Sequence, residues 1–125
     1  MNDVKTAIGS AAWVDLTVGD AVTIRDFYQS VVGWRPEPVG MGDYDDFNML
    51  DADGRAVAGV CHARGQNAGL PAQWLIYVVV EDVDASAATC QSLGGAVLVA
   101  PRAMGKGRYC VIRDPAGAVC ALYTP

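Results

Sequence analysis

Hydrophobic and polar residues follow the same order in the two halves of the chain. Residues 13–18 (WVDLTV) alternate, with Val, Leu and Val on one side and Trp, Asp and Thr on the other, which predicts a half-buried strand. Residues 74–79 (WLIYVV) are rich in aromatic and β-branched side chains and predict a second strand. Asp20 and Asp82, which follow these runs, are suited to begin helices. The pattern therefore predicts a strand followed by a helix, twice.

The two helices are predicted over residues 21–32 and about 84–93. Four large apolar residues of the first helix have the i, i+3, i+4, i+7 spacing of a single stripe: Ile24, Phe27, Tyr28 and Val31. Glycines follow both segments, at Gly33 and at Gly94-Gly95, and glycine is the residue that most often ends a helix. We expect the stripe of the first helix to face a core.

Matching positions show that the two halves are repeats. Val18-Gly19-Asp20 recurs 62 residues later as Val80-Glu81-Asp82. The turn at residues 51–54 recurs 63 residues later at residues 114–117, so the offset changes by one within the module. Each of these turns lies between two short apolar runs, which predicts a hairpin.

Each repeat therefore reads strand, helix, strand, strand, strand. This order predicts the α+β class, with βαβββ modules over about 12–62 and 74–124. The polar, glycine-rich residues 63–73 would connect them. We expect one domain over residues 1–125, because two modules of this size share one core more readily than they build two.

Composition restricts the partners. The chain of 125 residues has a net charge of −5 and no basic run, so nucleic acid is not an expected partner. It has no apolar run of the roughly 18 residues that cross a membrane and no signal-peptide pattern at its start, so we expect a cytoplasmic protein without a membrane partner. The apolar fraction of 52% indicates a cavity or a subunit interface. The four cysteines form no Cys-x-x-Cys pair and are expected to be reduced and packed.

Three motifs give the chain a resemblance to a known superfamily. They are Phe27-Tyr28 with Gly33-Trp34 at the first helix end, Glu81–Asp84 at the second helix start, and the closing Asp-Pro-x-Gly turn at residues 114–117. With two βαβββ modules, they resemble the vicinal oxygen chelate superfamily of glyoxalase I, extradiol dioxygenases, fosfomycin-resistance and bleomycin-binding proteins. The resemblance implies curled mixed sheets that form a cupped cavity, helices outside, and a homodimer.

Metal-dependent members of this superfamily hold a divalent ion with residues on the first and last strands of each module. The positions that correspond here are Trp13, Leu75, Ala121 and Ala58, or Gly59 if the register shifts by one. None of these side chains is a metal ligand. The resemblance is therefore to a metal-free member, and no cofactor is expected. An alternative keeps a metal, with Asp15 and His62 as ligands.

Alternation predicts which side chains would line the cavity. If the four corresponding positions face it, so do Asp15, Thr17, Val60, His62, Tyr77, Val79, Val119 and Tyr123. Phe47 and Met49 would close one wall, with a facing that is open by one residue. The loop 101–108 would be a mobile flap that offers Lys106 or Arg108 to an anionic group, or it would be a solvated approach to the closing hairpin.

Two functions fit this lining. The first is binding of a small aromatic or amphipathic molecule, with Trp13, Asp15, Phe47, His62, Leu75, Tyr77, Arg108 and Tyr123 as the candidate binding residues. The second is a lyase, isomerase or oxygenase that acts on a small organic substrate without a metal or, alternatively, with one. Asp15 or a tyrosine would transfer the proton, and Asp15 is the candidate catalytic residue, since a partly desolvated carboxylate can act as a general base. A structural ion pair or a solvated rim position would equally account for Asp15.

Overall fold

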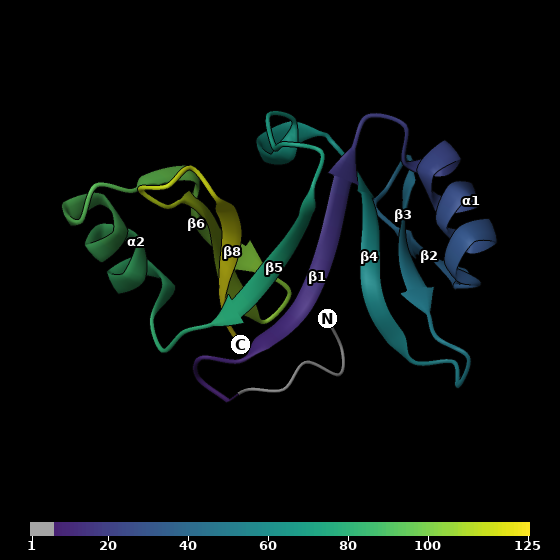
Figure 1. Cartoon of the computed structure of the whole chain (residues 1–125), viewed down its shortest axis with the longest axis horizontal. Coiled ribbons are helices and arrows are strands. Elements are labelled where there is room, and N and C mark those ends of the chain that lie inside the picture. The colour runs from purple at the N-terminus through teal and green to yellow at the C-terminus, as the bar shows by residue number, and fades with distance from the viewer. Residues whose placement is uncertain (1–6) are drawn as a thin grey trace. The chain divides into compact units, whose positions relative to one another are not determined.

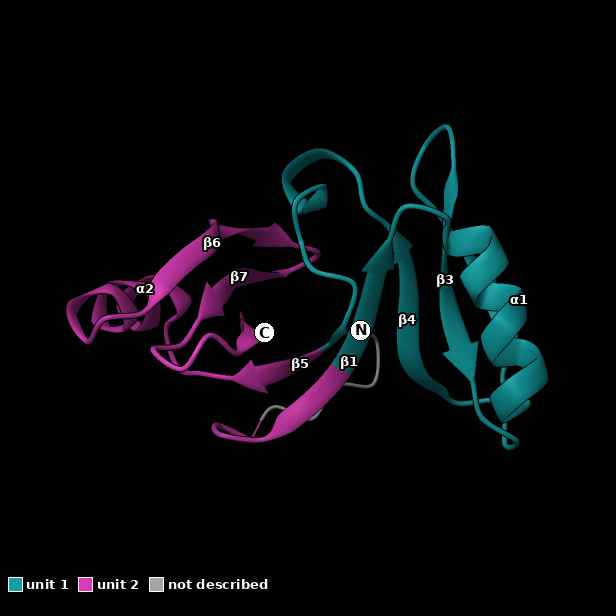
Figure 2. Cartoon of the chain, turned by 45° about the horizontal axis from the view of Figure 1, so that its top comes forward, with its two compact units in different colours: residues 1–3, 14–74 teal, residues 4–13, 75–125 magenta. Residues whose placement is uncertain are grey.

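The computed structural model describes residues 7–125, which form two compact units (Figures 1 and 2). The described part of unit 1 is Val14–Trp74, and that of unit 2 is residues 7–13 with Leu75–Pro125. The expectation that the start of the chain carries no signal peptide concerns residues 1–6 among others, and these six lie outside the described residues. No helix within residues 7–125 is long and apolar enough to cross a membrane.

Unit 1 is a βαβββ module. Its elements are β1 (Ala11–Val18, of which residues 14–18 belong to this unit), α1 (Ala21–Val32), β2 (Arg35–Gly40), β3 (Asp45–Leu50) and β4 (Ala56–His62). The strand order is β2-β3-β4-β1. β1 and β4 are parallel and the other pairs antiparallel, so the sheet is mixed.

Unit 2 repeats this arrangement after a short 3₁₀ turn at Gly65–Asn67. Its elements are β5 (Trp74–Val79), α2 (Val83–Ser92), β6 (Ala96–Met104), β7 (Gly107–Arg113) and β8 (Val119–Thr124), with strand order β5-β8-β7-β6. The α+β class and the βαβββ order predicted from the sequence are confirmed.

A β-bulge in unit 1 explains the change of offset between the repeats. The parallel strands keep one register, because Asp15 pairs with Gly59 and Tyr77, 62 residues later, pairs with Ala121. In the β3–β4 hairpin, however, the register skips Val57, whereas the β7–β8 hairpin has no such shift. A bulge adds one residue to one strand of a pair. Of the two positions considered from the sequence, Ala58 and Gly59, it is therefore Gly59 that corresponds to Ala121.

Side chains of the helices fix where each begins. The Asp20 carboxylate accepts hydrogen bonds from the Thr23 backbone N–H (3.1 Å) and from the Thr23 hydroxyl (2.7 Å). These bonds lower the pKa of Asp20, the hydroxyl bond contributing most. Asp82 accepts from the Ala85 N–H in the same way (3.2 Å). Both caps are those predicted from the sequence.

Each unit has its own hydrophobic core beneath its helix. In unit 1 the buried members are Ala21, Phe47, Met49, Ala58 and Val60, with Ile24 and Tyr28 of α1 packed against them. In unit 2 they are Val83, Ala87, Cys110 and Leu122. The α1 stripe is only half used, because Phe27 and Val31 remain 53% and 63% exposed. Apolar surface therefore remains along α1.

All four cysteines are free thiols, and Cys110 is fully buried. Burial raises the pKa of Cys110 from 9.0 to about 11, with smaller contributions from neighbouring groups. Burial likewise raises the pKa of Cys61 and of Cys120. A buried protonated thiol behaves as a small hydrophobic side chain.

We expect the Cys110 thiol to make stability fall as the pH rises from about 9 to about 11. Because the folded state holds this proton more tightly than the unfolded state does, unfolding becomes more favourable once the unfolded thiol ionises. A pKa of about 11 in the folded state, against 9.0 in the unfolded chain, corresponds to roughly 2–3 kcal/mol. Urea denaturation at pH 8, 9, 10 and 11 measures it. The Cys110→Ala variant should have a shallower pH dependence than the wild type, and equal slopes would contradict the prediction.

Candidate functional site

The two faces of the unit 1 sheet differ in chemistry. Phe47, Met49, Ala58 and Val60 face α1 and belong to the core. By alternation and strand register, the opposite face carries a mainly polar set: Asp15, Thr17, Asp46, Asn48, Gly59 and Cys61. Ala58, Val60 and His62 were expected on the same face as Asp15, and this expectation is wrong. The bulge adds one residue to β4, so these three side chains lie on the opposite face of the sheet. Phe47, left open by the sequence, lies on the α1 face.

Cys61 lies between two carboxylates on this polar face. Burial chiefly, and then the charges of Asp15 and Asp46, raise the pKa of its thiol, which hydrogen bonds to Asp46. A protonated thiol is neither a nucleophile nor a metal ligand. Asp46 also accepts a hydrogen bond from the His62 backbone N–H (2.8 Å), and the His62 ring packs edge-on against Tyr44. Asp46 therefore joins β3 to β4, while a catalytic role of Asp15 stays a prediction.

In unit 2 the face opposite α2 is apolar and aromatic. Leu75, Tyr77 and Tyr123 lie on it, with exposed fractions of 0%, 6% and 8%. Register places them beside Val79, Tyr109, Val111 and Ala121, and the Tyr77 and Tyr109 ring centroids are 6.5 Å apart. These side chains share one face, as alternation predicted.

Arg108 lies on the other face of unit 2. Its guanidinium donates to both carboxylate oxygens of Asp84 in the first turn of α2 (2.9 and 3.0 Å), and this pairing raises the pKa of Arg108. Residues 101–108 form a hairpin instead of a long loop, because β6 runs to Met104, β7 begins at Gly107 and a tight turn joins the two paired strands. Arg108 therefore holds α2 on the sheet.

The metal positions inherited from the superfamily do not fit a metal ion. With the register corrected, they are Trp13, Gly59, Leu75 and Ala121, which offer no side-chain donor. Within residues 7–125, no group of three or more His, Cys, Asp or Glu residues is placed to hold a metal ion. Asp15 and His62, the alternative ligands, extend from opposite faces of the unit 1 sheet.

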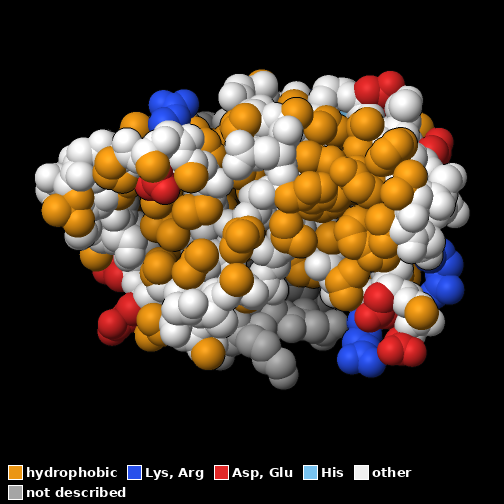
Figure 3. Space-filling model, viewed as in Figure 1, with side chains coloured by type: hydrophobic (Ala, Val, Ile, Leu, Met, Phe, Trp, Pro, Cys, Tyr) orange, Lys and Arg blue, Asp and Glu red, His pale blue; other side chains and the backbone are white. Residues whose placement is uncertain are grey.

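Unit 1 contains an apolar cavity of about 290 Å³ beside α1, here called the α1 cavity. It is lined by Leu16, Val18, Ile24, Phe27, Tyr28, Ala72, Gln73 and Trp74. Figure 3 shows hydrophobic side chains gathered over unit 1 next to α1. The cavity lies where α1, the end of β1 and the segment before β5 meet. None of its lining residues had been selected as a candidate from the sequence.

Aromatic side chains build one wall of the α1 cavity. The Tyr28 ring lies edge-on to Phe27 and to Trp74, with centroids 5.0 and 5.2 Å apart, and Trp34 packs against Trp74 at 5.7 Å. The Trp74 Nε1–H donates a hydrogen bond to the Tyr28 hydroxyl oxygen (3.2 Å). Edge-to-face packing and this bond fix the wall before any ligand arrives. The stripe of α1 placed Phe27 and Tyr28 on one helix face, but nothing in the sequence showed that part of this face would line a cavity.

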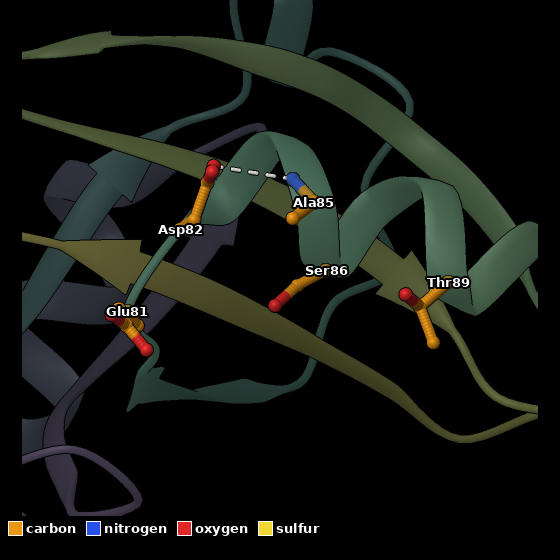
Figure 4. Close-up of a pocket in the computed structure, with 5 residues that line it drawn as sticks. All are labelled: Glu81, Asp82, Ala85, Ser86 and Thr89. Atoms are coloured by element: carbon orange, nitrogen blue, oxygen red, sulfur yellow. Dashed lines mark hydrogen bonds between the residues drawn. The ribbon is translucent and has the colours of Figure 1, made fainter.

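A second hollow, of about 350 Å³, follows the exposed side of α2 (Figure 4). It is lined by Glu81, Asp82, Ala85, Ser86 and Thr89. The Asp82 carboxylate already accepts from the Ala85 N–H in the first turn of α2, and the charges of Asp82 and Glu81 disfavour anions. Its lining has two carboxylates and no aromatic side chain, so the α1 cavity is the better candidate for an apolar ligand.

Comparison with known proteins agrees with this fold. A family model described as a glyoxalase-like domain matches residues 12–123. The anthracycline biosynthesis protein DnrV of Streptomyces peucetius is 33% identical over 95% of this chain and 48% of its own length. The putative glyoxylase CFP32 of Mycobacterium tuberculosis is 30% identical over 94% of this chain and 44% of its own length. The chain thus spans about half the length of the curated relatives it matches.

Solved structures show the same fold at low identity. Methylmalonyl-CoA epimerase from Mycobacterium tuberculosis superposes with a TM-score of 0.60 at 16% identity, covering 98% of this chain and 92% of the epimerase chain. A glyoxalase/bleomycin resistance protein/dioxygenase superfamily member from Vibrio splendidus gives 0.57 at 13% identity, covering 90% and 97%. At such identities the likeness concerns the fold alone. Because the family model matches almost the whole chain, this chain belongs to the glyoxalase-like family, and the resemblance stated from the sequence is confirmed.

Proposed function

We propose that this protein binds a small aromatic or amphipathic molecule, and that the α1 cavity is where it binds. The observation that carries the proposal is an apolar cavity with a preformed aromatic wall in unit 1. Its volume of about 290 Å³ is close to the lower end of the range for ligand pockets, which are mostly apolar with a few polar groups. The polar groups here are the Tyr28 hydroxyl and the Gln73 side chain.

The relatives support a planar ligand. DnrV and its counterpart DauV are anthracycline biosynthesis proteins, and anthracyclines are flat aromatic compounds. A flat ring can pack against the edges of Phe27, Tyr28 and Trp74, as aromatic groups pack against one another in protein cores. We expect the ligand of this chain to belong to the same broad class of shape.

The alternative is an enzyme that acts without a metal, with Asp15 as its general base. Its support is the position of Asp15 on the polar face, close enough to Cys61 to act on its thiol electrostatically. The Asp15→Asn variant tests it, because the amide cannot accept the proton. Turnover of any substrate found should fall at least 100-fold, and unchanged turnover would remove Asp15 from catalysis.

The binding proposal is tested with 2-ethylnaphthalene as a probe in isothermal titration calorimetry. The Phe27→Ala variant should bind it about five- to tenfold more weakly, because one aromatic wall of the cavity is lost. Phe27 is 53% exposed, so the fold should survive. The control is Val31→Ala, on the same helix and 63% exposed but outside the lining. Equal affinities in wild type and Phe27→Ala would contradict the proposal.

The expected homodimer is measured in the same samples by sedimentation velocity. A second copy packed on Phe27 and Val31 would cover the α1 cavity. Binding of the probe would then weaken as the protein concentration rises, and both alanine variants would dissociate the dimer. That pattern would assign this surface to self-association instead of to a small ligand.

A further inference from the structure

The Tyr28 hydroxyl belongs to a residue that lines the α1 cavity, and its hydrogen-bonding role follows from its partner. An indole N–H can only donate, whereas a phenol can both donate and accept. Because Trp74 Nε1 lies 3.2 Å from the Tyr28 oxygen, that oxygen is the acceptor. The Tyr28 proton must therefore point away from Trp74.

The Trp74 bond leaves the proton of the Tyr28 hydroxyl for another acceptor, because the hydroxyl oxygen accepts in that bond and does not donate. Tyr28 is half-buried and lines the cavity. Its ring is held between Phe27 and Trp74, at angles of 88° and 77°, so the hydroxyl has a fixed position. A donor that is fixed in an apolar site favours a ligand that supplies an acceptor.

The charge of the surroundings limits the kind of acceptor. The lining contains no lysine or arginine, and the nearby Arg25 pairs with Asp26 (2.8 Å) and lies over the Phe47 ring. A ligand carboxylate would lose its hydration without gaining a cation, which is costly. A neutral carbonyl oxygen loses little and accepts a hydrogen bond well.

We infer that the α1 cavity selects planar apolar molecules that carry a neutral carbonyl group, with the Tyr28 hydroxyl donating to the carbonyl oxygen and Trp74 holding that hydroxyl in place. This inference rests on the proposed function and adds the ligand chemistry to it. Tyr28 determines specificity, and Trp74 is a positioning residue. Aromatic ketones are the class of ligand that we expect this cavity to bind.

The test compares 2-acetylnaphthalene with 2-ethylnaphthalene, which have nearly the same shape and differ in the carbonyl. Calorimetry gives the ratio of their affinities for the wild type and for Tyr28→Phe. Removing the hydroxyl should lower the relative preference for the ketone about three- to tenfold, the usual effect of one neutral hydrogen bond. Taking the ratio between variants removes the difference in hydration of the two probes.

Tyr44→Phe is the matched control, because Tyr44 lies in unit 1 against His62 and Arg64 and outside the cavity lining. It should leave the ratio unchanged. Infrared spectra of the bound ketone give a second readout: its C=O stretch should lie at lower frequency in the wild type than in Tyr28→Phe. If neither probe binds the wild type, the proposed function fails. If both bind and neither the ratio nor the stretch changes in Tyr28→Phe, only the inference is overturned.

Discussion

The Gly107→Ala variant should lose about 3 kcal/mol or more of its free energy of unfolding, since forced overpacking without room to relax reaches that size. A Cβ at residue 107 would overlap the Thr124 carbonyl oxygen and lie 3.0 Å from Tyr123 Cε1 and 3.1 Å from Pro125 Cα. Two of these atoms are backbone atoms, at the last residue of β8 and at the residue after it, and backbone cannot turn aside as a side chain does. Gly107 is also the first residue of β7, paired with Met104. The strain should therefore affect both antiparallel pairs that β7 forms, with β6 and with β8.

Urea denaturation of Gly107→Ala beside Gly40→Ala measures this effect. Gly40 ends β2, and an added Cβ there would meet nothing within 4 Å. Its alanine variant should be neutral or slightly more stable, because alanine lowers the entropy of the unfolded chain. A loss below about 1 kcal/mol for Gly107→Ala would mean that the end of β8 yields. A comparable loss for Gly40→Ala would attribute both effects to glycine replacement in general.

The fold was predictable because the sequence contains the same βαβββ module twice. Asp20 and Asp82 begin the two helices, and the Asp15–Gly59 and Tyr77–Ala121 pairs recur at one offset. What could not be read was the bulge at Val57. A bulge changes the count along a strand without changing its composition, so Ala58, Val60 and His62 were assigned to the wrong face. The changed offset of the hairpin turn marked the region but not the residue.

The candidate site was less predictable, since it depends on contacts between residues far apart in the chain. The spacing of Phe27 and Val31 shows that they share the α1 stripe but not whether another element covers them. Trp74 looked like the first residue of a strand, and its bond to Tyr28 joins positions separated by 46 residues. Arg108 looked free to meet a ligand, yet its partner Asp84 lies 24 residues earlier. Local patterns do not contain such pairings.

The Met49→Ala variant should lose 2–5 kcal/mol, about the usual cost of truncating a fully buried methionine. Met49 has no exposed surface and packs beneath α1 with Phe47, Ala58 and Val60. The loss has two parts, the transfer of the removed atoms and the cavity left behind. It is a large share of the 5–15 kcal/mol that stabilises a typical domain, so the midpoint of urea unfolding should fall clearly. Met49→Leu, which nearly conserves volume, should lose less than about 1.5 kcal/mol.

The comparison of these two variants also tests the aromatic wall, because Tyr28, Trp34 and Trp74 pack on the same core as Met49. If Met49 supports that wall, Met49→Ala should weaken the near-ultraviolet circular dichroism of the tryptophans and the binding of 2-ethylnaphthalene, whereas Met49→Leu should preserve both. Tighter binding in Met49→Ala would mean that the probe occupies the space left by Met49, since an empty apolar cavity can bind an aromatic molecule. A stability loss for Met49→Ala no larger than that for Met49→Leu would show that the core refills the space. In that case Met49 would not hold Tyr28 and Trp74 in position. Their edge-to-face contact and the Trp74–Tyr28 hydrogen bond would be sufficient for that.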